Sequence, residues 1–366
     1  MKSNTKKIII MIMFILLGIT VSFAQQKNKS FNIGNNGRLE VNISFGDINI
    51  DVWSKPEIDV KYDEDEDSGS SFKMIQNGNT LTITSGDDPG EDLSLSVPSS
   101  INLDLNSAGG DIKINGNITG KIDCSTAGGD IKTNDITGNA SLNTSGGEIT
   151  TGQINGNAAI NSGGGDLKLG VISGTADLGT GGGNITVSDV KKGLTLRTGG
   201  GNVNAANVDG ELIITTGGGN VDVMKVKGST KVTTGGGNIS LNSTTGNNKF
   251  TTGGGNLTLK DVNGGIKCYT GSGDVYVELN PDPKVNSEIK SGSGNITLYI
   301  PSNAKATIVA KVRDWGTLGN EGKYPISSDF TKATEDKSSD RLKDVYILNG
   351  GGSEIEIETS SGEIHI

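Results

Sequence analysis

Apolar and polar residues alternate in short segments that repeat every 18 residues along most of this chain. Counted from the Asp or Asn after each glycine run, apolar residues stand one and three positions later, as Ile185 and Val187 do. They recur ten and twelve positions later, as Leu194 and Leu196 do, and Val190 shows one further aliphatic position between the two segments. Alternation of period two between glycine-centred turns predicts short β-strands.

The Asp or Asn after the glycine run recurs with a nearly fixed spacing. The spacing is 18 residues from Asp130 through Asp274, with 19 before that stretch and 21 after it. One such unit is too short to bury its own apolar face, so the repeat predicts a solenoid of stacked coils. The positions of this repeat ladder are Asp111, Asp130, Glu148, Asp166, Asn184, Asn202, Asn220, Asn238, Asn256, Asp274 and Asn295.

The predicted fold is therefore all-β: a single-stranded parallel β-helix of about 18 residues per coil, capped at both ends. Roughly eleven coils at about 4.8 Å each give a rod on the order of 50 Å long. Crossovers between parallel strands are strongly biased to the right hand, which favours a right-handed coil. A left-handed hexapeptide helix is disfavoured, because Asn184 and Asn202 break its aliphatic residue at every sixth position.

Composition divides the chain into four regions. Residues 1–24 are predicted to be a signal peptide cleaved after Ala24, because lysines precede an apolar stretch that ends in small residues. Residues 25–103 are expected to form an N-terminal β cap with degenerate first coils, and residues 104–300 the regular solenoid. Residues 301–366 are expected to form a C-terminal cap with a long loop excursion. We expect an exported protein of the periplasm, cell surface or medium, with no transmembrane segment in the mature chain.

Charge and cysteine content narrow the picture further. A formal net charge of −10 and a shortage of arginine disfavour a nucleic-acid partner, since phosphate neutralisation needs a basic face. Cys124 and Cys268 occupy equivalent inward positions eight coils apart, roughly 38 Å at the usual strand spacing. A disulfide requires Cα atoms within about 7 Å of each other. We predict two free, buried thiols.

The acidic members of the repeat ladder raise the possibility of a calcium row. Glycine motifs occur here once per 18 residues, whereas calcium-binding repeats have them about once per nine, and five central positions hold Asn. Lys113, Lys132 and Lys168 stand two residues after the acids and disappear with them in the Asn coils. This pattern favours a structural ladder of paired charges, with no metal or other cofactor.

Threonine forms two further rows. Outward Thr215, Thr233 and Thr251 resemble an ice-binding array, but Lys231 and Lys249 beside them interrupt it, so ice binding is disfavoured. The inward hydroxyls are expected to hydrogen-bond along the stack or to the glycine turns. These inward residues are Thr144, Ser162, Thr180, Thr198, Thr216, Thr234, Thr252 and Thr270.

Catalysis is not expected. The single histidine, His365, is next to last and has no Ser or Cys constellation around it in sequence, so no catalytic residue is predicted. A lyase would need a basic residue such as Arg313 or Arg341 beside acidic ligands. Trp315, Trp53 and Arg313 are the candidate glycan-binding residues of the two caps, because aromatic faces can stack on sugar rings.

Several segments resemble one known family. They are Gly-Asp-Ile at 46–48, Leu-Ser-Val-Pro-Ser-Ser at 95–100, the repeated Gly-Gly-Asp/Asn-Ile, the segment 294–301 and the closing segment 359–364. Together they resemble the bacterial adhesin-type β-strand-repeat family, domains of unassigned function on exported or envelope proteins. The resemblance covers nearly the whole mature chain. It implies a surface role and carries no catalytic or ligand residues.

The expected function is therefore a structural or adhesive binding role at the cell envelope or surface, without catalysis. Any binding is expected on the lateral strand faces and on the excursion at 301–349, with a surface glycan or an envelope protein as partner. We expect a monomer or weak end-to-end self-association. Two alternatives stay open: a carbohydrate-active enzyme (polysaccharide lyase or hydrolase) on a β-helix scaffold, and a self-assembling envelope filament.

Overall fold

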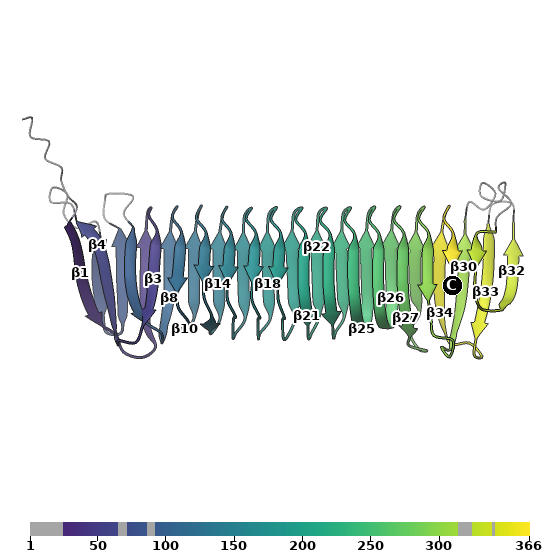
Figure 1. The fold of residues 1–366 in the computed structure, drawn as a ribbon, viewed down its shortest axis with the longest axis horizontal. Helices are drawn as coiled ribbons and strands as arrows, with labels where there is room; N and C mark the ends of the chain where they lie inside the picture. Colours follow the sequence, from purple (N-terminus) through teal and green to yellow (C-terminus); the bar gives the residue numbers. More distant parts are fainter. Residues whose placement is uncertain (1–24, 65–71, 86–91, 314–323, 339–340) are drawn as a thin grey trace, which may run out of the picture.

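The computed structural model describes residues 25–64, 72–85, 92–313, 324–338 and 341–366, so the predicted signal peptide lies outside the described residues. The chain forms a long rod of strands stacked side by side, with β1 near one end and β32 near the other (Figure 1). All named elements of the described ranges are strands. The parallel β-solenoid of about 11 turns and roughly 18 residues per turn is confirmed.

No helix in these ranges has the length and apolar character that crossing a membrane requires.

A single coil shows how 18 residues make one turn of the solenoid. β18 (Ala176–Thr180) crosses the first side, a glycine run turns the chain, and β19 (Ile185–Val187) crosses the second side. Val190 then forms isolated parallel bridges to Ile172 and Val208 of the two neighbouring coils at the third corner. Each strand pairs in parallel with the equivalent strands of its neighbouring coils, so equivalent side chains stand in line along the rod.

We call the outer surface of the first side the long-strand face. Its central strands are β8 (Ile101–Ser107), β11 (Ile122–Thr126), β14 (Ala140–Thr144), β16 (Ala158–Ser162), β18, β20 (Leu194–Thr198), β22 (Leu212–Thr216), β24 (Thr230–Thr234), the second halves of β25 (Ile239–Thr252) and β26 (Leu257–Thr270), and β28 (Ser287–Ser291).

The second side presents the short-strand face. It is built from β9 (Ile112–Asn115), β12 (Ile131–Thr133), β15 (Ile149–Thr151), β17 (Leu167–Leu169), β19, β21 (Val203–Val208), β23 (Val221–Val226), the first halves of β25 and β26, β27 (Val275–Pro281) and β29 (Ile296–Tyr299). At the third corner β10 (Ile118–Thr119) pairs with β13 (Ile136–Thr137).

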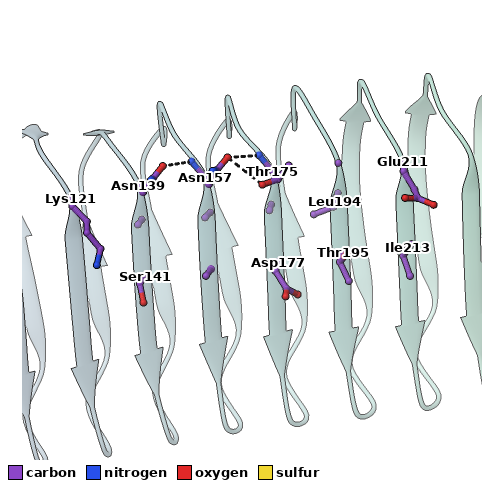
Figure 2. A pocket seen from close by; sticks show the side chains of 15 residues that line it. Lys121, Asn139, Ser141, Asn157, Thr175, Asp177, Leu194, Thr195, Glu211 and Ile213 are labelled. Atoms are coloured by element: carbon purple, nitrogen blue, oxygen red, sulfur yellow. Dashed lines mark hydrogen bonds between the residues drawn. The ribbon is translucent and has the colours of Figure 1, made fainter.

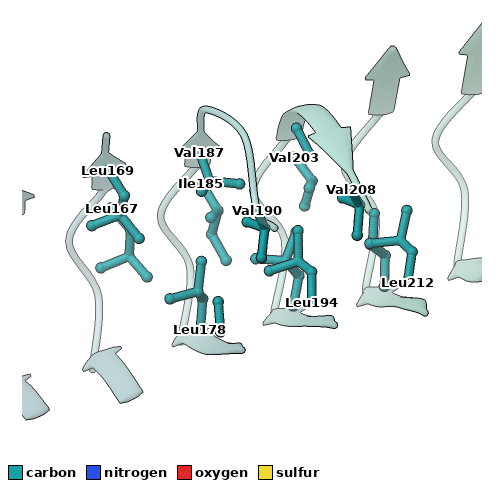
Figure 3. Packing of buried hydrophobic residues seen from close by; sticks show 14 of the residues in the cluster. Leu167, Leu169, Leu178, Ile185, Val187, Val190, Leu194, Val203, Val208 and Leu212 are labelled. Carbon is teal, nitrogen blue, oxygen red and sulfur yellow. The ribbon is translucent and has the colours of Figure 1, made fainter. Parts of the chain in front are cut away.

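The interior is a continuous apolar column. Leu178, Ile185 and Val190 point inward from the three sides of one coil and are all 0% exposed (Figure 3). The next coil repeats the arrangement, with Leu196 in the row of Leu178 and Val203 in the row of Ile185. Each coil therefore covers the apolar residues of its neighbours, which explains why the period is strict throughout the regular region.

The first coils stack out of sequence order. β2 lies between β8 and β6, and β3 lies between β9 and β7, all in parallel. Antiparallel strands β5 and β4 pair with β6 and β7, and β1 pairs with β4, so they cover this end. The bounds are β1 (Gln25–Asn32), β2 (Gly37–Ile43), β3 (Ile48–Trp53), β4 (Glu57–Glu64), β5 (Phe72–Asn77), β6 (Thr80–Ser85) and β7 (Leu93–Pro98).

The last coils are interleaved in the same way. β34 inserts between β28 and β30, and β35 inserts between β29 and β31, so the C-terminus lies inside the rod's outline and not at its tip (Figure 1). β33 and β32 add antiparallel strands outside β30. The bounds are β30 (Ala306–Val312), β31 (Ile326–Ser327), β32 (Lys332–Lys337), β33 (Leu342–Leu348), β34 (Ser353–Thr359) and β35 (Ile364–His365).

The two cysteines are free and buried, as predicted. Cys124 and Cys268 are 0% exposed, and burial raises the pKa of both thiols. We expect a thiol reagent to label neither residue in the folded protein and both after unfolding without reductant, because only unfolding exposes them to solvent. Counting labelled thiols by mass spectrometry checks this, and fewer than two labels in denaturant would contradict it.

Candidate binding surface

The repeat ladder runs along the glycine corner, where its side chains bond to the backbone of the next coil. The Oδ1 atom of Asn202 accepts a hydrogen bond from the backbone N–H of Asn220 at 2.9 Å, and Asn220 accepts from Asn238 at 2.8 Å. The chain of contacts also includes Asp47 at one end and Glu363 at the other. A short side chain with an acceptor oxygen satisfies each N–H, which explains the choice of Asp or Asn.

Glu148 departs from this pattern. Its carboxylate lies 2.7 Å from the Lys168 ammonium and 2.8 Å from the Thr150 hydroxyl. The hydrogen bond from Lys168 holds the pKa of Glu148 below its ordinary value. The oxygens of the ladder are thus engaged by backbone or side-chain donors, and we infer a structural role for it. In the ranges that the structure describes, no three His, Cys, Asp or Glu side chains gather as metal ligands would.

The inward hydroxyls fasten the glycine corners. The Thr216 hydroxyl donates to the carbonyl of Gly201 in the preceding coil at 3.1 Å and accepts from the N–H of Gly219 at 3.2 Å. This confirms the predicted bonding of the inward row to the glycine turns. The same pair of contacts is made by Thr126, Thr144, Ser162, Thr180, Thr198, Thr234, Thr252, Thr270, Ser291 and Thr359.

Trp53, a candidate glycan-binding residue, lies on β3 near the first end of the rod. Its indole N–H donates to the carbonyl oxygen of Glu57 at 2.9 Å. The Lys55 ammonium stands 4.5 Å from the centre of the Trp53 ring. The ring is half-buried, and a cation already covers one of its faces.

Arg313, a second candidate, follows β30 near the other end. Its guanidinium pairs with Glu358, which is 7% exposed on β34. The structure therefore places Arg313 and Trp53 at opposite ends of the rod (Figure 1). Trp315 lies outside the described residues.

A shallow groove of about 480 Å³ runs lengthwise on the long-strand face. Asn139, Asn157 and Thr175 line its upper margin in Figure 2, where Asn157 donates its backbone N–H to Asn139 at 2.9 Å and accepts from Thr175 at 3.0 Å. Outward side chains in these coils are small, as Ser141 and Ala159 are, so the surface sinks below that of the neighbouring coils. The groove runs along the rod, across successive strands.

Polar groups are spaced along this groove, which ends at an apolar residue. Lys121, Ser141, Asp177 and Thr195 lie along it from coil to coil, and Ile213 follows them (Figure 2). The Asp177 carboxylate pairs with Arg197 at 2.6 Å on the exposed surface. The sequence predicted binding on a lateral strand face, but it did not locate the groove. The signal that marks it is the run of small residues at the outward strand positions.

Beyond β26, the long-strand face carries a network of mutually neutralised charges. The Lys290 ammonium lies 2.5 Å from Glu288 and 3.4 Å from Glu356, and Lys311 lies 3.0 Å from Glu356. Hydrogen bonds from these lysines lower the pKa values of both carboxyls. Lys290, Lys311, Glu288 and Glu356 therefore neutralise one another at this end of the face.

A second hollow, of about 350 Å³, lies where β27 and β29 end. Asp261, Glu278, Tyr299 and Pro301 are among the residues that line it. Tyr299 is 51% exposed, and its ring centre lies 5.4 Å from that of Tyr276. An exposed aromatic ring beside carboxylates is a competing place for a sugar, and it serves below as a contrast to the groove.

The fold and this surface define a class: a parallel β-solenoid whose regular coils present a grooved lateral sheet. The chain belongs to the Toastrack DUF4097 family, whose sequence profile matches residues 36–209 and 180–366. This match confirms that the chain belongs to a known family along nearly its whole mature length, and it assigns no activity. A comparison with curated proteins finds no match.

Solved structures give three distant similarities. A "putative cell adhesion protein" from Clostridium sporogenes is 12% identical, covers 94% of this chain and 99% of its own, and has a TM-score of 0.20. A "putative adhesin" from Parabacteroides distasonis is 14% identical, with coverages of 76% and 98% and a TM-score of 0.25. A "putative lipid binding protein" from the same species is 13% identical, with coverages of 74% and 96% and a TM-score of 0.18. Because the identities and TM-scores are low, we base no functional conclusion on them.

Proposed function

We propose that this chain is an exported, non-catalytic β-solenoid of the cell envelope or surface that binds an extended glycan along the long-strand face. The groove of about 480 Å³ is the observation that carries the proposal. Parallel in-register pairing fixes the groove's lining side chains at a regular spacing of about 4.8 Å per coil. A rigid surface of this kind meets a linear polymer with little loss of conformational freedom on the protein side.

The chemistry of the lining suits sugar hydroxyls. Ser141 and Thr195 supply hydroxyls that can donate and accept, and Asn139 and Asn157 supply amides. Ala159 adds a small apolar surface against which the carbon–hydrogen faces of a sugar can pack. Extended polymers of hydroxyl-bearing units therefore fit this lining better than compact ligands do.

Export belongs to the same proposal. The lysines and apolar stretch of residues 1–24 would direct the chain through the membrane, with cleavage after Ala24. The mature protein would then act in the periplasm, at the cell surface or in the medium. A surface location is where a glycan-binding rod would meet its ligand.

Neither alternative function is favoured by a specific observation. His365 lies on β35, where its Nδ1 atom is 3.0 Å from the Ser327 hydroxyl, far along the rod from the groove. For the filament, the outermost strand β32 carries Lys332, Glu335 and Lys337, and charges on an edge strand oppose strand addition. We therefore expect a monomer that does not release products from glycans.

The test uses purified residues 25–366 and immobilised neutral and acidic polysaccharides. Ala159 is an exposed, outward residue of β16, and Ala159→Trp is expected to fill the groove and weaken retention at least about tenfold, equivalent to about 1.4 kcal/mol. Thr186→Trp is the matched control, since Thr186 is exposed at the middle of β19 on the short-strand face. This control is expected to bind as wild type does.

Three outcomes would overturn the proposal. The wild-type protein retaining no polysaccharide would remove the glycan-binding role. Loss of retention in Tyr299→Ala with full retention in Ala159→Trp would move the site to the second hollow. New reducing ends or unsaturated uronides in the same tubes would show that the chain is an enzyme.

A further inference from the structure

Three lysines stand in line on the long-strand face, in three consecutive coils. Lys231 is the register partner of Lys249, and Lys249 is the register partner of Lys267. All three side chains are exposed. Within the part of the chain that the structure describes, none of them forms an ion pair. We call this set the lysine row.

The lysine row is electrostatically unfavourable in the isolated protein. Equal charges about 4.8 Å apart repel each other by roughly 1 kcal/mol in water. One carboxylate stands in line with the row, because Glu288 is the register partner of Lys267, but it pairs with Lys290 at 2.5 Å. Elsewhere on the same face, Arg197 lies 2.6 Å from Asp177. The chain has ample acid for such pairing, because its net charge is −10. A bound anion would relieve the repulsion that the row creates.

The lysine row continues the groove. Ile213, which lines the groove, is the register partner of Lys231. On the far side of Lys231, a hollow of about 370 Å³ is lined by Lys249, Lys267 and Asn247. The groove, the row and this hollow form one straight track from β11 to β26, eight coil spacings or roughly 38 Å long.

An unsatisfied hydroxyl lies beside the row. Thr251 follows Lys249 by two residues on β25, and its Oγ1 atom is buried without a hydrogen-bond partner among the described residues. A buried polar group without a partner is destabilising by about 1–3 kcal/mol. Rotation of the Thr251 side chain would bring this hydroxyl to the surface, where an oxygen of a ligand lying over the row could accept its hydrogen bond. The observation is independent of the charge of the lysines.

We propose that the glycan bound along the long-strand face is acidic, and that Lys231, Lys249 and Lys267 bind its carboxylate or sulfate groups. This inference rests on the proposed function and names the class of polymer. The uncharged part of the polymer lies in the groove, and its acidic groups lie over the lysine row. Ammonium groups act as point charges without a fixed fork geometry, so the row recognises the spacing of anionic groups along a chain.

A nucleic acid fits the same track less well. The surface as a whole is acidic, and the row supplies three cations without an aromatic platform of its own for bases. Tyr269 is the aromatic neighbour of the row, and its hydroxyl is already hydrogen-bonded to Glu288. Single-stranded DNA therefore enters the experiment as a competitor and not as the expected ligand.

The experiment measures binding of polygalacturonate, dextran sulfate and neutral dextran to residues 25–366 at low and high salt. The two acidic probes separate carboxylate from sulfate as the source of the charge. At least one of them is expected to bind about tenfold more tightly than neutral dextran, and more weakly in high salt. The variant K231Q/K249Q/K267Q is expected to lose that preference, with at least a tenfold weaker affinity for the acidic probe.

A charge-matched control separates the row from net charge. K113Q/K132Q/K260Q removes three exposed lysines outside the track and is expected to change the affinity less than twofold. The row variant should also melt at a temperature equal to or above that of wild type, because it removes like-charge repulsion. That readout confirms that weakened binding does not come from unfolding.

The outcomes distinguish this inference from the proposed function. Equal binding of neutral and acidic polymers, lost in Ala159→Trp but kept in the row variant, would overturn the acidic ligand and leave the groove's function standing. Equal losses in the row and control variants would overturn the role of the row itself. Retention of no polysaccharide would overturn both proposals, and preferential binding of single-stranded DNA would replace the glycan by a nucleic acid.

Discussion

Replacing Gly219 with alanine is expected to disrupt the stack, whereas the same change at the adjacent Gly218 is tolerated. A Cβ atom on Gly219 would lie 1.9 Å from the carbonyl oxygen of Gly201 in the preceding coil. That oxygen belongs to the backbone, so neither coil can move aside without breaking its pairing. A Cβ atom on Gly218 meets nothing within 4 Å. Overpacking at Gly219 is expected to lower the free energy of unfolding by roughly 3 kcal/mol.

Chemical and thermal denaturation of the two variants measure this difference. The Gly218→Ala variant should stay within about 0.5 kcal/mol of wild type, as surface changes usually do. The chain itself supports the contrast, because the middle position of the run is occupied by Ser272 and Ser293 in other coils. Similar destabilisation by both variants would show that the glycine run is needed for flexibility and not for close backbone approach.

Replacing Asp344 with alanine is expected to loosen the C-terminal end of the rod. Asp344 is 0% exposed on β33, and its carboxylate accepts from the Tyr324 hydroxyl at 2.9 Å and pairs with the Lys332 ammonium at 2.9 Å. The Tyr346 hydroxyl lies 3.3 Å away from the same carboxylate. Alanine removes the acceptor on which these donors converge, and the expected destabilisation is about 3 kcal/mol.

Glu335→Gln provides the matched control for Asp344. Glu335 lies 2.6 Å from the same Lys332 ammonium but on the exposed side of β32. Its pKa is lowered to about 2 by the hydrogen bond from Lys332, yet solvent screens this contact. Hydrogen exchange of residues 324–348 should rise strongly in Asp344→Ala and little in Glu335→Gln. Equal exchange in the two variants would contradict the role of the buried carboxylate.

The sequence was sufficient to predict the regular coils because each coil repeats the environment of the one before it. Once Leu194 and Leu196 point inward, register pairing with the next coil forces Leu212 and Ile214 inward as well. The 18-residue period in the sequence therefore indicates which residues of neighbouring coils contact each other. The same logic placed Cys268 in the core without any further information.

The two ends could not be predicted in the same way. Gly46 and Glu363 both belong to recognisable copies of the repeat motif, but a motif does not state which coil is its neighbour. Glu363 donates its backbone N–H to Asn295, which is 68 residues away, because β34 and β35 insert beside the last regular coil. The order in which strands stack at the ends depends on pairings between segments far apart in the sequence. The local pattern of apolar and polar residues does not specify those pairings.

The binding surface was foreseen only in outline. Lys231 and Lys249 were noticed in the sequence as interruptions of a threonine array, yet their register partner Lys267 and the hollow beside them depend on the stack. The groove forms where outward side chains are smaller than those in the neighbouring coils. Because it spans several coils, it can be located only once the coils have been stacked.

The bonding pattern of the repeat ladder has a consequence for how this protein can change over generations. Each regular coil offers the next the same acceptor, such as Asn202 Oδ1, and takes the same donor from it, such as the N–H of Asn220. Duplication or deletion of one whole 18-residue segment therefore joins compatible surfaces and leaves both ends of the rod untouched. Unequal recombination within the gene would alter the reach of the molecule by about 4.8 Å per event without creating a new fold. Length is thus a trait that selection can adjust in uniform steps.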